Sequence, residues 1–414
     1  MPNNQCGRSI AIWGEAPQGA AVSPDKKLNV HFNYWHSRSQ RSKKKGSADF
    51  LDIGLMAYDC AGLSRLRVYV PLALTIDDIE DLGGLFREPV VASIVFNESV
   101  STTNAHNSNY ITLQVAANSV YARVYVFSKD AKGTPLNSEL SVMPDGEGTL
   151  IDICQSAIAN GYTGLAAGKP LYFRLRIRLQ AKGNTAFSRT TKPADGWLLS
   201  SFDYTEFLDF RLNEARNLPQ NAIQKMWPGG QPHPGTPSIS RVDFLVIVGD
   251  SADVAEGVEC DKKRLLEGEL WGTYTKTPKG WQQNLSNGMV IYHWKKPAKP
   301  PAVDIGDFSA FIKLKIRRSS WSLVWRYLLV VALIGSPGSL LVNFVWSGFN
   351  MESWVKPAGA KAAEPLEAPQ AASPPSPDHG GRKDNNGRSL AVKGSKSLEI
   401  GKGAGAPATL EKTQ

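Results

Sequence analysis

The chain has 414 residues, a formal net charge of +9 and a hydrophobic share of 42%. This length allows one large domain or two ordinary ones with appendages, and the modest hydrophobic share excludes a polytopic membrane protein. The positive charge favours anionic partners, either nucleic acid or lipid headgroups, although it also fits a solvated surface. Residues 1–27 are polar and rich in Gly and Pro, so we expect a flexible lead-in there.

The cysteines are scattered along the chain, at Cys6, Cys60, Cys154 and Cys260. They form no C-x-x-C pair and have no histidine at ligand spacing, which argues against a disulfide scaffold and a structural zinc site. Reduced thiols of this kind fit a cytoplasmic domain. The N-terminus has no apolar stretch after a basic start, so no cleavable secretion signal is expected.

Short β-type runs follow one another from residue 28 onward, separated by clusters of Gly, Asn, Asp and Pro. The predicted strands are Leu28–His36, Phe50–Tyr58, Arg65–Leu74, Val90–Phe96, Tyr110–Ala116, Tyr121–Phe127, Leu171–Leu179, Val242–Val248, Leu270–Thr275, Met289–Trp294 and Ala310–Ile316. Helix signals are confined to Thr75–Leu82, Glu147–Asn160 and Pro219–Met226. The sequence therefore predicts a mainly β fold, built as an antiparallel β-sandwich or barrel with few helices.

The segment 227–237 is so rich in Pro and Gly that it cannot form a helix or the interior of a strand. It is either a linker between a β-rich domain at 28–226 and a second subdomain at 238–318, or an excursion from a single domain. The apolar strand Val242–Val248 needs a sheet to join, so we favour the excursion.

Tyr327–Phe349 contains no charged residue and is long enough for a helix to cross the hydrocarbon core of a bilayer. We predict one transmembrane helix at 322–349, in a single-pass membrane protein. Its expected membrane-interface residues are Trp321, Trp325, Arg326 and Trp346. More basic residues precede the segment than follow it, which places the N-terminal domain in the cytoplasm and the tail on the far side. A buried core helix is the alternative.

The predicted span is interrupted at Gly335–Ser339, where Pro337 removes a backbone donor. We expect a kinked span, with a re-entrant hairpin as the alternative. Gly335 and Ser339 also have the spacing of small residues that lets helices approach closely, so self-association through the membrane segment is a further expectation. Residues 356–414 contain hardly any large apolar side chain and are predicted to be disordered.

Basic residues alternate with apolar ones on two predicted strands. Leu171–Leu179 carries Arg174, Arg176 and Arg178, and the last strand carries Lys313, Lys315 and Arg317. Alternation places each set on one face of its strand. Like charges on neighbouring strands must be offset by an anionic ligand, by lipid headgroups or by acidic side chains. We therefore predict an anion-binding basic face, with headgroups favoured for the strand that precedes the membrane segment.

Gly249-Asp-Ser251 directly follows the strand Val242–Val248 and resembles the nucleophile block of the GDSL esterase family. In that family a downstream Asp-x-x-His supplies the histidine that activates the serine. No such motif follows here, and His293 lies inside a predicted strand. The resemblance covers these few residues and implies, as an alternative function, a hydrolase with Ser251 as its catalytic nucleophile.

Together these features predict a membrane-anchored cytoplasmic binding or scaffolding protein whose basic face contacts anionic headgroups or another anionic or protein partner. A second alternative is a nucleotide or nucleic-acid sensor that signals to the membrane segment, with aromatic residues between Trp271 and Trp294 stacking on bases. We predict no cofactor and no metal site. The acids of Asp77–Asp81 lack the spacing of a calcium loop, and His31 and His36 point to opposite faces of their strand.

Overall fold

The structure is a computed structural model that describes residues 8–17, 19, 25–36, 49–104, 108–116, 119–179, 186–191, 203–249, 252–257, 259–275, 288–317 and 321–349. Contacts divide the chain into one unit at Met1–Val342 and another at Asn343–Gln414. The predicted disordered tail at 356–414 lies outside the described residues. The prediction of a flexible lead-in is wrong for Ala11–Glu15, which forms β1, a largely buried strand paired with β4.

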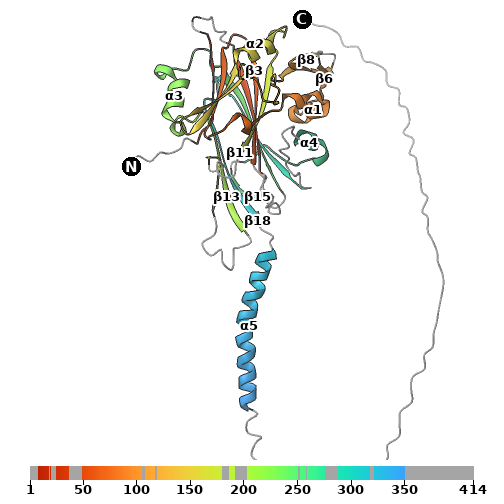
Figure 1. The fold of residues 1–414 in the computed structure, drawn as a ribbon, viewed down its shortest axis with the longest axis vertical. Coiled ribbons are helices and arrows are strands. Elements are labelled where there is room, and N and C mark those ends of the chain that lie inside the picture. Colours follow the sequence, from red (N-terminus) through yellow and green to blue (C-terminus); the bar gives the residue numbers. More distant parts are fainter. Residues whose placement is uncertain are drawn as a thin grey trace, which may run out of the picture. The chain divides into compact units, whose positions relative to one another are not determined.

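The described strands form three sheets, most of whose strand pairs are antiparallel (Figure 1). The largest has the order β16-β17-β14-β2-β3-β11-β8-β7-β6, with β5 beside β11. Its strands are β2 (Lys27–Trp35), β3 (Asp49–Tyr58), β5 (Ile79–Asp81), β6 (Ser101–Asn104), β7 (Tyr110–Val115), β8 (Ser119–Tyr125), β11 (Leu171–Leu179), β14 (Ser238–Val248), β16 (Lys262–Leu265) and β17 (Val290–Pro297). We call it the central sheet.

Two four-stranded sheets complete the β structure, with the orders β1-β4-β10-β9 and β12-β13-β18-β15. Their remaining strands are β4 (Arg65–Val70), β9 (Leu140–Asp145), β10 (Gly148–Cys154), β12 (Ser188–Thr191), β13 (Asp203–Leu212), β15 (Ala252–Gly257) and β18 (Phe308–Arg317). The prediction of a mainly β fold with few helices is confirmed.

The three sheets share one hydrophobic core. It contains Phe32, Ile53 and Leu175 from the central sheet, Val68 from β4 and Ile312 from β18. Because side chains alternate along a strand, residues between these positions point to the other face of the central sheet.

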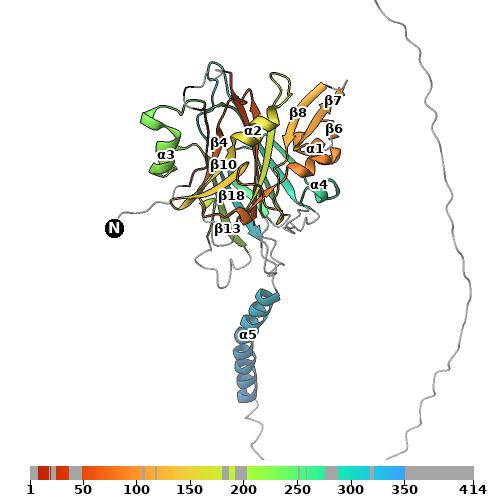
Figure 2. The same ribbon diagram turned by 45° about the horizontal axis from the view of Figure 1, so that its top comes forward.

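Short helices cover the outer faces of the sheets. The helices within the described residues are α1 (Pro89–Phe96), α2 (Gln155–Tyr162), α3 (Gln220–Met226), α4 (Gly268–Thr275) and α5 (Trp321–Phe349), with 3-10 turns η1 (Ile76–Asp78), η2 (Gly83–Arg87), η5 (Ala215–Asn217) and η6 (Pro228–Gly230). On the outer face of the central sheet, Trp35 and Ile247 pack against Val91 of α1 and Trp271 of α4. In both views α3 lies on the opposite side of the sheets from α1 and α4 (Figures 1 and 2).

Two of the predicted strands are helices in the structure. Val90–Phe96 lies in α1, which has Pro89 at its start and ends at Asn97 in the left-handed conformation with φ 54°. Proline suits the first turn of a helix, and asparagine tolerates the left-handed conformation that ends one. Leu270–Thr275 lies in α4. In both cases packing against the outer face of the central sheet outweighs the β propensity of the local sequence.

The segment 227–237 is an excursion that returns to the same sheets. Thr236 Oγ1 donates to the carbonyl of Gly14 at 3.1 Å, and the Ala16 N–H donates to the carbonyl of Pro234 at 3.1 Å. After it, β14 pairs with β2, and β18 later pairs with β13. Residues 238–317 therefore complete sheets that begin before the excursion.

α5 is a single helix of 29 residues that runs through Gly335–Ser339 without a break, so the alternative of a re-entrant hairpin at this point is wrong. Among the described residues, no helix combines the length and the apolar character that crossing a membrane requires.

Candidate functional site

The predicted basic face on β11 is not accessible. Arg174 and Arg176 are both fully buried, whereas Arg178 is half-buried. Arg176 donates from Nε and Nη2 to the two carboxylate oxygens of Asp52, at 2.6 and 2.9 Å. Arg174 donates from Nε to Tyr274 Oη at 2.9 Å. The prediction of an anion-binding surface is therefore wrong for Arg174 and Arg176, because acidic and aromatic side chains within the protein offset their charge.

Asp52 is the centre of this buried cluster. It also accepts hydrogen bonds from Trp35 Nε1 at 2.7 Å and from Tyr274 Oη at 2.7 Å. Burial disfavours its ionised form, but the attraction and hydrogen bonds of Arg176, together with Arg174 and Tyr274, outweigh burial and lower the pKa of Asp52. Asp52, Arg174 and Arg176 have no exposed side-chain surface, so the cluster holds α4 against the sheet and offers nothing to a ligand.

In β18, basic and apolar residues alternate as predicted. Ile312, Leu314 and Ile316 lie in the core, whereas Lys315 and Arg317 are exposed and Lys313 is half-buried. Lys315 lies opposite Asp253 of β15 in the strand register, and opposite charges in such positions attract each other. Anion binding by Lys313, Lys315 and Arg317 stays a prediction.

Other predicted site residues lie outside the described part of the chain. This holds for Ser251, so the hydrolase alternative stays a prediction. On α5, Trp325 is exposed, and the side chains of Trp321, Arg326 and Trp346 are outside the description.

Four of the five aromatic residues predicted to stack on bases are buried, and the fifth, Trp281, lies outside the described residues. Trp271 and Tyr274 of α4 are buried against the outer face of the central sheet, and Tyr292 and Trp294 of β17 lie in the main core. These four rings are therefore occupied by packing and cannot stack on bases.

A different polar site lies on the outer face of the central sheet, beyond the apolar residues that pack against α1 and α4. Along β14, Leu245 and Ile247 pack with residues of α1 and α4. The next residues on the same face are Asp243 and Arg241. Register places His31 of β2 directly beside Asp243, and His293 of β17 directly beside Leu245. We call His31, Arg241, Asp243 and His293 the Asp243 site.

Asp243 joins the other three side chains. His293 Nε2 lies 2.9 Å from Asp243 Oδ1, and Arg241 Nη2 donates to the same oxygen at 2.8 Å. His31 Nε2 lies 3.6 Å from Asp243 Oδ2. One carboxylate thus fixes the orientation of a guanidinium and an imidazole that both remain partly exposed, with 40% of the Arg241 and 23% of the His293 side chain accessible.

The charge states of the site follow from burial and pairing. Burial disfavours ionisation of Asp243, but the hydrogen bonds from His293 and Arg241 outweigh it and lower the pKa of Asp243 to about 2. Burial also lowers the pKa of His31 to about 4, against the attraction of Asp243. At neutral pH, Asp243 is therefore ionised and His31 is neutral.

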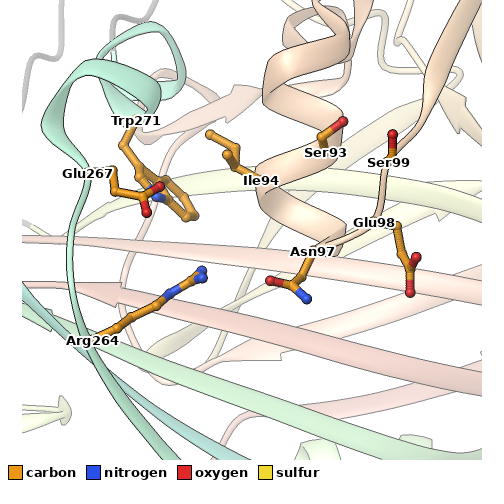
Figure 3. A pocket seen from close by; sticks show the side chains of 8 residues that line it. All are labelled: Ser93, Ile94, Asn97, Glu98, Ser99, Arg264, Glu267 and Trp271. Carbon is orange, nitrogen blue, oxygen red and sulfur yellow. The ribbon is translucent and has the colours of Figure 1, made fainter. Parts of the chain in front are cut away.

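A pocket of about 400 Å³ lies between α1 and α4, and its lining residues are distinct from those of the Asp243 site. Arg264 of β16 and Asn97 at the end of α1 point toward each other across it, and Glu267 and Trp271 form its other wall (Figure 3). The connection to the Asp243 site is Phe96, which precedes Asn97 and whose ring lies 6.3 Å from that of His31.

Further cations lie on the same face as the site. In the register, Lys262 lies opposite His293, and Lys295 lies opposite Asp243. Directly paired residues of a ladder share a face, and both lysines are exposed, as is Arg264. The nearby acids are Glu98 and Glu267 on the pocket wall and Asp261, whose Oδ2 accepts from the backbone N–H of Lys295 at 2.6 Å. The sheet surface around Asp243 is thus cationic, and the rim of the pocket is mixed.

We expect acid to destabilise the protein through His31. An unfolded histidine has a pKa of about 6.5, whereas the pKa of folded His31 is about 4. The unfolded state therefore binds the proton first, and stability is lost as the pH falls from about 6.5 to about 4, by at most about 3 kcal/mol. Asp243, with its pKa of about 2, extends the loss to lower pH.

Urea unfolding of the wild type and His31→Gln at pH 7.5 and 4.5 checks this expectation. The wild type should lose more stability between the two pH values than the variant does. Equal losses would show that His31 does not cause the acid sensitivity.

Sequence reasoning missed the Asp243 site, although one signal for it exists. Asp243 interrupts the apolar run Val242–Val248, directly after Arg241, and His293 interrupts the apolar run Val290–Trp294. Only the pairing of β2, β14 and β17, which are far apart in the sequence, brings them together.

No family model matches the chain, and no curated protein matches it.

Proposed function

We propose that the protein is a membrane-attached binding protein whose β domain binds a small anionic ligand at the Asp243 site. The observation that carries the proposal is the fixed, partly exposed guanidinium of Arg241 among Lys262, Lys295 and His293, together with the pocket of about 400 Å³ between α1 and α4. That volume is within the range of small-molecule sites, which extends from roughly 300 to 1,000 Å³.

The fixed orientation of the Arg241 side chain supports the binding of an anionic ligand. Arg241 is already oriented by Asp243, so binding to it costs little side-chain entropy. A guanidinium pairs well with phosphate or carboxylate groups, and the lysines add attraction that salt should weaken. Glu98 and Glu267 on the pocket wall favour a ligand that also carries hydroxyl or amine donors.

Binding fits the site better than catalysis does. Among the described residues, no serine, threonine or cysteine side chain donates a hydrogen bond to His31 or His293. A histidine without such a neighbour does not activate a protein nucleophile. We therefore favour a role in ligand binding for His31 and His293.

Membrane attachment by α5 is the second part of the proposal. Tyr327–Phe349 contains no charged residue, and its large apolar side chains are at least half exposed at Leu328, Leu329, Val331, Leu333, Val342, Phe344 and Val345. Exposed apolar surface of this extent marks a membrane or protein contact. The preceding basic residues favour a cytoplasmic β domain. Whether α5 crosses the bilayer or lies in its surface is a separate outcome of the test, because no described helix meets the requirements for a span.

Calorimetric titration with inorganic pyrophosphate tests the proposed site. We expect saturable binding to the full chain that weakens with salt and falls about tenfold or more in Arg241→Gln, since a hydrogen bond between charged groups contributes about 1.5–3 kcal/mol. Lys132→Gln is the matched control, because Lys132 is an exposed cation outside the site. Equal weakening in both variants would indicate nonspecific charge attraction and contradict the proposal.

A further inference from the structure

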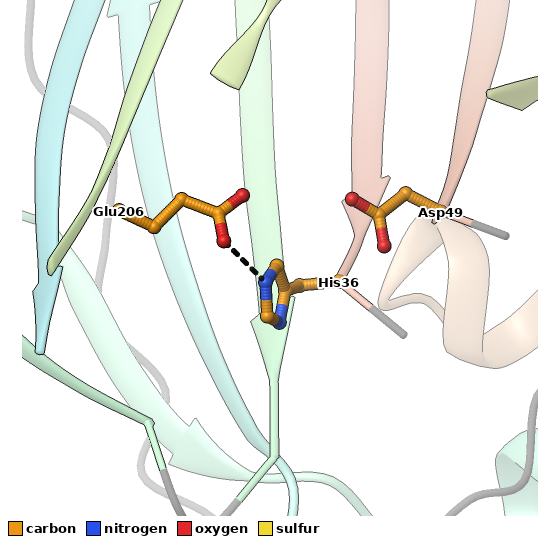
Figure 4. A group of neighbouring side chains, drawn as sticks. All are labelled: His36, Asp49 and Glu206. Atoms are coloured by element: carbon orange, nitrogen blue, oxygen red, sulfur yellow. Dashed lines mark hydrogen bonds and ion pairs between the residues drawn. The ribbon is translucent and has the colours of Figure 1, made fainter. Parts of the chain in front are cut away.

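A second polar cluster lies inside the protein, between the central sheet and the sheet of β13. It consists of His36, which follows β2, Asp49, which begins β3, and Glu206 of β13 (Figure 4). His36 and His31 lie on opposite faces of the central sheet, so this cluster is separate from the Asp243 site. The backbone N–H of His36 donates to the carbonyl of Ile247 at 2.9 Å, which fixes the position of His36 beyond the end of β2.

The three side chains converge in the interior. His36 is 4%, Asp49 3% and Glu206 0% exposed. One imidazole nitrogen and one oxygen from each carboxylate all lie within 4.8 Å of one another. Two carboxylates at this separation repel each other strongly when water is excluded. A divalent cation at the point where they converge is attracted to both carboxylates.

The spacing suits a bound metal ion. His36 Nε2 and Glu206 Oε2 lie 3.3 Å apart. Two ligand atoms that each lie about 2.0–2.1 Å from a tetrahedral ion are separated by about 3.3 Å, which is the same spacing. An imidazole with two carboxylates is a donor set that zinc and the neighbouring divalent transition metals accept.

Tyr34, which lies outside the cluster, also supports a metal site. Tyr34 Oη donates to Asp49 Oδ2 at 2.8 Å. This hydrogen bond fixes the orientation of the Asp49 carboxylate. Such outer hydrogen bonds typically orient the carboxylate ligands of metal sites.

We propose that His36, Asp49 and Glu206 bind one divalent transition-metal ion of the zinc type. The ion neutralises the two carboxylates and joins the central sheet, through His36 and Asp49, to the sheet of β13, through Glu206. Because the three ligands are brought together only by folding, the ion binds the native state and stabilises it. This site does not depend on the anionic ligand proposed above.

Zn²⁺ titration of the chelator-treated full chain tests the proposal, with Co²⁺ as a coloured substitute. We expect one equivalent of Zn²⁺ to bind, a visible Co²⁺ absorption band of tetrahedral type, and a higher thermal midpoint in the presence of Zn²⁺. His36→Gln and Glu206→Gln should each weaken binding at least about 100-fold. Tyr34→Phe keeps all three ligands and should weaken binding about 10- to 100-fold.

The matched control is His31→Gln, which removes a histidine of the same strand from the other face of the sheet and should leave Zn²⁺ binding unchanged. Binding that is lost in His31→Gln and retained in His36→Gln would place the ion at the Asp243 site and overturn the proposal. The absence of stoichiometric binding to the wild type would overturn it as well. Since Tyr34→Phe removes no ligand, a folded Tyr34→Phe protein with unchanged affinity would contradict the orienting role of Tyr34.

Discussion

Asp52→Asn is expected to destabilise the β domain by about 3–5 kcal/mol, the cost of breaking a buried ion pair by removing one partner. Asp52 pairs with Arg176 through two hydrogen bonds and lies 3.7 Å from Arg174 Nη2. The substitution keeps the shape of the side chain but removes the carboxylate that pairs with the two fully buried guanidinium groups. It also weakens the attachment of α4, because Tyr274 donates to Asp52.

Equilibrium unfolding in urea measures this loss. Asp209→Asn is the matched control: Asp209 pairs with Arg211 at 2.8 Å, but both side chains are about one quarter exposed, at 24% and 28%. Exposed ion pairs contribute little, so the control should lose no more than about 1 kcal/mol. Similar effects of the two substitutions would show that the Asp52 cluster does not hold the fold together.

Introducing two charges into α5 is expected to release the protein from membranes. Val331→Asp with Leu333→Asp replaces two exposed apolar side chains, and an aspartate at the centre of a membrane helix costs roughly 2.5–3.5 kcal/mol on insertion scales. The wild-type chain should stay in the membrane pellet after alkaline carbonate extraction, and the double variant should move to the supernatant.

Val331→Leu with Leu333→Ile keeps the segment apolar and should leave the protein in the pellet. Protease treatment of intact vesicles then separates a crossing from a surface position, because a tail beyond a spanning α5 is protected on one side only. Complete release of the wild type by carbonate would contradict attachment through α5.

The sequence predicted the positions of the strands better than it predicted which residues cover their faces. The alternation in Leu171–Leu179 shows that Arg174 and Arg176 share a face, and the structure has β11 over this range. It does not show what covers that face. The partner of Arg176 is Asp52, 124 residues away, and that of Arg174 is Tyr274, 100 residues away. Burial of the two arginines is a property of the tertiary fold.

Local β propensity gave the wrong secondary structure where a short helix packs on a sheet. Pro89–Phe96 is rich in β-branched residues, yet it forms α1 because Val91 and its neighbours fill the space above Trp35 and Phe50. Propensities of this kind are weak compared with the burial of a hydrophobic face.

The two polar clusters could not be assembled from the sequence. His36 and Glu206 are 170 residues apart, and His293 and Asp243 are 50 residues apart on adjacent strands. The period of two did show that His31 and His36 face opposite sides of their strand. The pairing of β2 with β14 places Asp243 beside His31. The acidic partner of His36 is Glu206 of β13, which belongs to a different sheet.

The central claim is that an anionic ligand binds at the Asp243 site, and NMR of isotope-labelled histidine rings during titration with pyrophosphate tests it most directly. We predict that the ring signals of His293 shift in a saturable way, since His293 lies beside Asp243 and Lys262. Those of His233, in the excursion after α3, should stay in place. Signals of His293 that do not move at saturating pyrophosphate, or that move only together with those of His233, would contradict the claim.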